Sequence, residues 1–187
     1  METGFLCCIY KTYNSAGELI NTRTEGPAVV SRSKETGADN AKLDRLRDIH
    51  AKYCSGMKYM DEAEDILIGL INSERVKAGC TEFTTDDASA ETLISEIAAA
   101  ELIRNNFNYN SECFTQMEQY YPNYNIITLT LPASAGDDAA TISKLVNDEF
   151  MKNKDAVEIR CGKAYTKCGV AIAKVESGYV AVEIYNK

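Results

Sequence analysis

The feature that most constrains this chain is the stretch from Asp65 to Phe83, DILIGLINSERVKAGCTEF, which predicts an amphipathic helix with an abrupt end. Apolar residues recur at spacings of three and four, which places them on one stripe of a helix. Polar residues such as Asn72 and Arg75 occupy the other face, and Gly79 supplies the expected stop. The apolar stripe comprises Ala63, Ile66, Leu67, Leu70 and Ile71.

The other helices and strands are predicted from the same kind of periodicity. Helices are expected over residues 41–54, 88–105 and 139–151, with a short helix near 113–120. Strands are expected over residues 5–10, 125–131, 157–161, 168–175 and 178–185. The last two strands are close enough in sequence to form a hairpin. The stretch 11–40 contains Asn, Gly and Pro breakers and is expected to be irregular.

The order of these elements predicts the fold class. Helices come mainly first and strands cluster late, which favours a mixed α+β fold over alternating βαβ units. We expect helices packed on a mainly antiparallel sheet. At 187 residues the chain fits a single domain over 1–187 with one sizeable core.

Charge and hydropathy exclude several kinds of partner. The net charge of −8 argues against a nucleic-acid groove and against binding to an anionic membrane surface, because both need a basic patch. No run approaches the roughly 18 consecutive apolar residues that a transmembrane helix needs. We therefore expect no nucleic acid as a partner, and we expect any leader or anchor signal to lie outside this chain.

Seven cysteines are many for a chain of this length. They predict either three disulfides plus one free thiol, in an oxidising compartment, or scattered reduced cysteines in the core. None is arranged as CxxC and no His lies near any pair, so a zinc site has little support and no metal is expected. The acidic pairs at 86–87 and 137–138 each precede a predicted helix and are expected to cap it. The disulfide candidates are Cys7, Cys8, Cys54, Cys80, Cys113, Cys161 and Cys168.

His50, the only histidine, lies one helical turn before Cys54. On a helix this spacing puts both side chains on one face, where a Cys–His nucleophile pair is geometrically feasible. Such a pair needs a lowered thiol pKa and a third group that orients the imidazole, and the sequence shows neither. The favoured interpretation is a satisfied, partly buried histidine. We therefore expect no catalytic residues and no cofactor.

Two stretches carry a family resemblance: Leu70 to Phe83, LINSERVKAGCTEF, and Ala164 to Tyr185, AYTKCGVAIAKVESGYVAVEIY. They resemble the first helix and the closing hairpin of the CAP superfamily, which holds the cysteine-rich secretory proteins, the antigen-five allergens and the plant pathogenesis-related class-one proteins. The resemblance implies a three-layer αβα sandwich, with a CAP-like core over 61–187. Residues 1–60 would precede that core as a strand, an irregular linker and a helix.

The resemblance also implies that part of the family's chemistry is missing. CAP domains have a cavity in which two His and two Glu can hold a divalent metal, whereas this chain has a single His. At Tyr165-Thr166, where the family has a neighbouring His, this chain has Ala164 before and Lys167 after. The metal cavity is therefore expected to be lost. Glu101 falls on the buried stripe of the 88–105 helix. It is either a remnant of that cavity or a carboxylate that is paired with a Lys or Arg or lies at the edge of the stripe.

The first stretch is similar to the CAP-like surface antigens of coccidian parasites, which are small secreted, disulfide-bonded domains held by a GPI-type glycolipid anchor. The resemblance implies an extracellular, non-enzymatic antigen or recognition module at the host–parasite interface. Its partner would be a host or cell-surface protein, and only a lipid anchor would contact the membrane. One alternative is a carrier that binds a lipid or sterol as a small apolar ligand. Another is an intracellular protein with a reactive cysteine, Cys54 beside His50.

Overall fold

The computed structural model describes residues 4–13, 19–30, 37–83, 90–105 and 111–187. The chain divides into two compact units, Met1–Asn40 and Ala41–Lys187. Each unit is described by itself, so the single domain over 1–187 stays a prediction. Within the described residues, no helix is both long and apolar enough to cross a membrane.

The first unit contains an antiparallel pair of strands, β1 (Gly4–Tyr13) and β2 (Leu19–Val30). The strand predicted at 5–10 is confirmed, but the prediction that 11–40 is irregular is wrong where β2 runs. Gly26 and Pro27 had indicated a break. They fall at a register shift, because Leu6 pairs with Ala28 and Cys8 pairs with Glu25. Since proline has no N–H to donate to the ladder, a β-bulge is where a strand tolerates it. Residues 31–36 of the expected linker lie outside the described residues.

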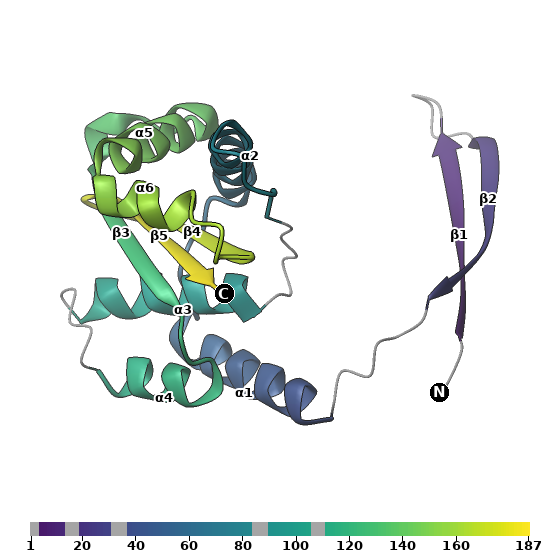
Figure 1. Cartoon of the computed structure of the whole chain (residues 1–187), viewed down its shortest axis with the longest axis horizontal. Coiled ribbons are helices and arrows are strands. Elements are labelled where there is room, and N and C mark those ends of the chain that lie inside the picture. The colour runs from purple at the N-terminus through teal and green to yellow at the C-terminus, as the bar shows by residue number, and fades with distance from the viewer. Residues whose placement is uncertain (1–3, 14–18, 31–36, 84–89, 106–110) are drawn as a thin grey trace. The chain divides into compact units, whose positions relative to one another are not determined.

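The second unit is built on a three-stranded antiparallel sheet with the order β3-β5-β4 (Figure 1). Its strands are β3 (Asn125–Pro132), β4 (Lys167–Val175) and β5 (Gly178–Asn186). The predicted hairpin is confirmed, with Val175 paired to Gly178 across the turn. Gly178 has φ +140°, and a Cβ there would lie 1.9 Å from the Leu131 carbonyl oxygen of β3. Only glycine allows the turn and the neighbouring strand to approach this closely.

The described part of the second unit contains six α-helices, so the structure confirms a mixed α+β fold with helices packed on an antiparallel sheet. Helices α1, α3 and α4 share a core cluster with one face of the sheet, and α2, α5 and α6 share a cluster with the other face. The two sets lie on opposite sides of the sheet in Figure 1. Side chains alternate between the faces along β4, since Ala171 and Ala173 belong to the first cluster and Val170 and Ile172 to the second. The helices are α1 (Gly37–Tyr53), α2 (Asp61–Lys77), α3 (Ala90–Arg104), α4 (Glu112–Tyr120), α5 (Ala139–Lys152) and α6 (Lys154–Arg160).

One predicted strand, at 157–161, is wrong, because Lys154–Arg160 forms helix α6. Asn153 caps this helix, and its side-chain oxygen accepts hydrogen bonds from the backbone N–H groups of Asp155 and Ala156 at 2.9 and 3.2 Å. The alternation of apolar and polar residues over five positions fits a strand as well as one face of a short helix. Tertiary packing decides between them, because the helix buries Ala156 and Arg160.

The predicted helix caps differ in outcome. Asp138 caps α5 as expected, and its carboxylate accepts from the Thr141 backbone N–H at 2.8 Å. Asp137 instead accepts hydrogen bonds from Lys174 at 2.7 Å and from the Tyr179 hydroxyl at 2.5 Å. The pair at 86–87 lies outside the described residues. The end of α2 is as predicted, since Gly79 adopts φ +73°, which an L-residue rarely does.

Candidate functional site

The last turn of α1 and the middle of α3 bring together His50, Cys54 and Glu96. Cys54 continues the helical hydrogen bonding of α1, with its backbone N–H donating to the His50 carbonyl at 2.8 Å, so the two side chains share a face. Glu96 forms a short hydrogen bond to His50, from Nε2 to Oε2. One imidazole nitrogen, the Cys54 sulfur and one Glu96 oxygen all lie within 4.8 Å of one another. We call these residues the His-Cys-Glu cluster.

The cluster is half-open rather than sealed. The side chains of His50 and Glu96 are 29% and 19% exposed, whereas Cys54 is only 7% exposed. The Tyr59 hydroxyl donates to the Glu96 backbone carbonyl at 2.9 Å. Burial and then the hydrogen bond with Cys54 raise the pKa of Tyr59, so the phenol keeps its proton. The cluster thus has a buried thiol at its base and two ionisable side chains near solvent.

Electrostatics hold the histidine of the cluster in its protonated form. Hydrogen bonds with Cys54 and then with Glu96 raise the pKa of His50 to about 10, although partial burial acts in the opposite direction. The ring is therefore an imidazolium at neutral pH, paired with the Glu96 carboxylate. This agrees with the favoured prediction of a satisfied, partly buried histidine. It also supplies the third group that the sequence could not show, because Glu96 lies on a different helix.

Glu101, the predicted cavity remnant, does not join this cluster. It is 7% exposed on α3, and its carboxylate accepts a hydrogen bond from the Asn105 side chain at 3.4 Å, one turn away. Burial and then the Glu101 charge raise the pKa of the Cys113 thiol to about 12. Glu101 therefore has an amide partner just past the end of α3, and not the Lys or Arg that the paired-carboxylate interpretation named.

A second buried carboxylate, Glu64 on α2, was missed in the sequence. It accepts a hydrogen bond from the Ile172 backbone N–H of β4 at 2.7 Å. Burial, opposed by this hydrogen bond, raises the pKa of Glu64 to about 8. The carboxyl group is therefore largely protonated at pH 7. Its sequence signal was weak, because Glu64 adjoins the apolar stripe beside Ala63 and resembles an ordinary first-turn acid.

The polar face predicted for α2 is wrong at Arg75, which is 1% exposed. Its guanidinium donates to the backbone carbonyls of Thr81, Arg160 and Tyr165 at 2.7, 2.6 and 3.1 Å. It also stacks on the Phe83 ring, with Cζ 3.6 Å from the ring centroid. Arg75 therefore ties the segment after α2 to the segment after α6.

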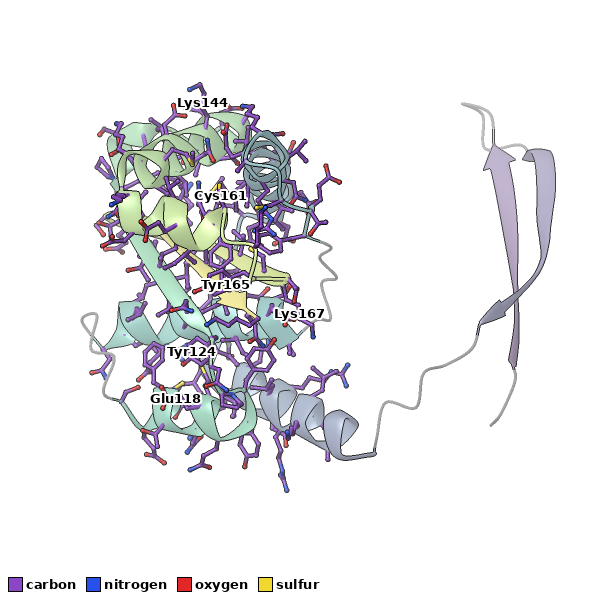
Figure 2. The ribbon with its side chains drawn as sticks, in the orientation of Figure 1. Glu118, Tyr124, Lys144, Cys161, Tyr165 and Lys167 are labelled. Carbon is purple, nitrogen blue, oxygen red and sulfur yellow. The ribbon has the colours of Figure 1, made fainter. Side chains whose placement is uncertain are left out.

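Cys80 and Cys161 lie side by side in the two segments that Arg75 joins. The Cys80 thiol donates to the Cys161 carbonyl oxygen at 3.0 Å, and both residues are half-buried. Burial and then the neighbouring Cys80 thiol raise the pKa of the Cys161 thiol. Figure 2 places Cys161 next to α6, with Tyr165 further along the same connection. Among the residues with described side chains, Cys54, Cys80, Cys113, Cys161 and Cys168 are free thiols, so the predicted disulfides stay a prediction.

The aromatic segment before β3 combines core packing with a surface hollow. Tyr120, Tyr121 and Tyr124 are partly buried against the core, while residues 106–110 lie outside the described part. Figure 2 shows Tyr124 beside α4, near Glu118. An open hollow of about 740 Å³ is lined by Pro122, Asn123, Tyr124, Asn125, Asn186 and Lys187.

Comparison with known proteins adds no relative to these observations. No protein-family model matches the chain, and no curated protein matches it either.

Proposed function

We propose that this chain is a secreted or surface-displayed recognition module with a CAP-like, three-layer αβα core stapled by disulfides. Helices on both faces of the sheet support the layered arrangement. Asn72 and Arg75, which lie in the first of the two stretches that carry the resemblance, add support, because both fix the segment that follows α2. Asn72 exchanges side-chain hydrogen bonds with the backbone of Phe83 at 2.7 and 3.0 Å, and Arg75 binds the Thr81 carbonyl.

The observation that carries the proposal is the juxtaposition of Cys80 and Cys161. The Cys80 sulfur lies 3.0 Å from the Cys161 carbonyl oxygen, and Arg75 fixes the backbone on both sides. We expect rotation of the two side chains to bring the sulfurs into bonding geometry, which the disulfide map described below tests. A thiol–disulfide oxidant of the secretory pathway would accept the two electrons while two protons leave. Because such bridges persist mainly in oxidising compartments, this favours an extracellular protein.

The recognition partner would be a host or cell-surface protein that meets loops held on a rigid scaffold, as the resemblance to parasite surface antigens implies. The hollow beside Tyr124 offers such a surface, with asparagine side chains and Lys187 around an aromatic ring. This lining suits a polar protein contact better than a sterol. It therefore does not favour the lipid-carrier alternative.

The test is a disulfide map of protein from an oxidising secretory host. We expect a peptide pair linked through Cys80 and Cys161, and at least two fewer alkylated cysteines without reductant than with it. The variant C80S should lose that linked pair, whereas the matched control C168S should keep it, since Cys168 is buried elsewhere in the core. Seven alkylated cysteines in the folded, unreduced protein would contradict the proposal.

The Glu96 contact favours a second candidate function, that of an intracellular protein with Cys54 as a nucleophile. Cys54, His50 and Glu96 have the residue types of a nucleophile, a base and an orienting carboxylate. Labelling with iodoacetamide at pH 7 should then modify Cys54 faster than every other thiol. Uniformly slow labelling would rule this candidate out.

A further inference from the structure

The His-Cys-Glu cluster offers one nitrogen, one sulfur and one oxygen donor from two helices. This set combines the three protein ligand types that zinc takes, whereas calcium and magnesium prefer oxygen ligands alone. With metal–ligand bonds of about 2.0–2.3 Å, donors around a tetrahedral zinc lie roughly 3.3–3.8 Å apart. The donors here lie within 4.8 Å of one another, and the two in hydrogen-bond contact are closer than in a zinc site. Small side-chain rotations would therefore bring all three to the spacing of a zinc site.

The scaffold fixes where these donors stand. His50 and Cys54 are one turn apart at the end of α1, whose Leu46 and Ile49 are buried in the core. Glu96 projects from α3 between Ser95 and Ile97, both 0% exposed. A metal would therefore bridge two packed helices and would not require a loop to fold around it.

The surroundings also suit a cation. The site is open on the His50 and Glu96 side, which leaves room for a water molecule as the fourth ligand. Tyr59 holds the Glu96 backbone through its hydroxyl, a contact that supports the position of a ligand residue. His50 Nε2 and Glu96 Oε2 already contact each other across the two helices, so a divalent cation bound there would take the place of that hydrogen bond.

We propose that His50, Cys54 and Glu96 form a binding site for one divalent cation of the zinc class, with a fourth position open to water. The site lies between α1 and α3 and does not use the residues on which the CAP resemblance rests. It is independent of the proposed recognition function and of the Cys80–Cys161 bridge.

The test is titration of the full-length protein with Co²⁺, kept reduced with a phosphine. Cobalt in a tetrahedral site with a thiolate ligand gives visible ligand-field bands and a sulfur-to-metal charge-transfer band. We expect saturation at one Co²⁺ per chain and displacement of the bands by Zn²⁺. The absence of visible bands, or bands that Zn²⁺ fails to displace, would overturn the proposal.

Variants assign the ligands. C54S should abolish the charge-transfer band, and H50N and E96Q should each weaken Co²⁺ binding by about 100-fold or more, since even second-shell changes cost about 10–100-fold. C113S is the matched control, a buried cysteine in the same core cluster, and should keep the band. The double variant C80S/C161S should also keep it, so that failure of the recognition proposal leaves this test intact. Far-ultraviolet circular dichroism of each metal-free variant checks folding.

Two results would overturn the assignment even if metal binds. One is a C54S variant that keeps the charge-transfer band while C113S loses it. The other is a Cys54–Cys113 disulfide in protein from an oxidising host, because a bridged sulfur cannot serve as a thiolate ligand. The disulfide map described above distinguishes these outcomes.

Discussion

The ion pairs on the two faces of the three-stranded sheet differ in how deeply they are buried. On the face covered by α2, α5 and α6, Arg160 and Glu183 are 1% and 0% exposed and form a bidentate ion pair. Asn147 accepts a further hydrogen bond from Arg160 at 3.0 Å, and the Tyr185 hydroxyl donates to Glu183 at 2.6 Å. On the face covered by α1, α3 and α4, the ion pair between His50 and Glu96 is half-open.

This difference in burial indicates which of the two networks a ligand could reach. A sealed network with every polar atom satisfied fixes one packing arrangement, and it has no route for a ligand to enter. A half-open cluster gains less stability from its charges, but its donor atoms stay within reach of solvent and of a ligand. We therefore assign a structural role to the Arg160–Glu183 network and a binding role to the His-Cys-Glu cluster. Four substitutions or sets of substitutions should separate these two roles, and they are ordered here by the expected change in the free energy of unfolding.

Breaking the sealed network should have the largest effect. R160M leaves the Glu183 carboxylate buried without its cation, and we expect a loss of about 3–5 kcal/mol in the free energy of unfolding. Urea denaturation followed by circular dichroism measures this. K144A, on the exposed side of α5, should leave the denaturation midpoint unchanged (Figure 2). A loss from R160M of less than about 1 kcal/mol would mean that water reaches Glu183.

Removing the tie made by Arg75 should cost slightly less. R75M leaves the backbone carbonyls of Thr81, Arg160, Gly162 and Tyr165 without this donor. We expect a loss of about 3 kcal/mol, because buried unsatisfied groups each cost roughly 1–3 kcal/mol and water would reach some of them. R75K should recover less than half of this, since an ammonium cannot reproduce the planar guanidinium fork. Equal stability of R75K and the parent would contradict this geometry. K77M is the matched control on the exposed side of the same helix.

Glu64 makes stability depend on pH. Its pKa is about 8 in the folded chain, above the ordinary value of 4.5, because of burial and then the charges of Glu96, Asp61 and Asp65, against the opposing Ile172 hydrogen bond. The folded state therefore holds a proton that the unfolded chain has released. This contribution to stability is full below pH 4.5 and declines as pH rises to about 8.

E64Q should remove this dependence while keeping an oxygen that can accept from Ile172. We expect the variant to equal the parent near pH 4.5 and to be more stable by a few kcal/mol at pH 8. Urea denaturation at both pH values measures the difference. A constant gap between E64Q and the parent across this range would show that Glu64 does not titrate as described.

Substitutions in the half-open His-Cys-Glu cluster should have the smallest effect on the free energy of unfolding. H50N removes a partly exposed ion pair, and we expect a loss of about 1 kcal/mol in metal-free protein, near the upper end for exposed pairs. E96Q should behave similarly, and H50N/E96Q should cost less than the sum of the two, because the partners interact. A loss as large as that of R160M would erase the difference between the two faces of the sheet.

Helices and strands whose signals lie within a few residues could be predicted from the amino-acid sequence alone. The apolar stripe of α2 and Gly79 defined one helix and its end, because helix periodicity and a left-handed stop act within a few residues. Asp138 predicted the start of α5 in the same way, because a capping side chain acts within one helical turn. The hairpin of β4 and β5 needed only two strand-like runs and Gly178. These local signals also carried the α+β class with an antiparallel sheet.

Features that depend on residues far apart in the chain became visible only in the folded structure. Residues 154–160 became a helix because Asn153 caps them and Arg160 finds Glu183 on β5. Arg75 became buried because the carbonyls that satisfy it come from the end of α6 and from the segment after α2, which are far apart in the sequence. The sequence suggested two of the three residues of the His-Cys-Glu cluster, since His50 and Cys54 are one helical turn apart. The third, Glu96, comes from the packing of α3 against α1, which periodicity along one helix cannot specify.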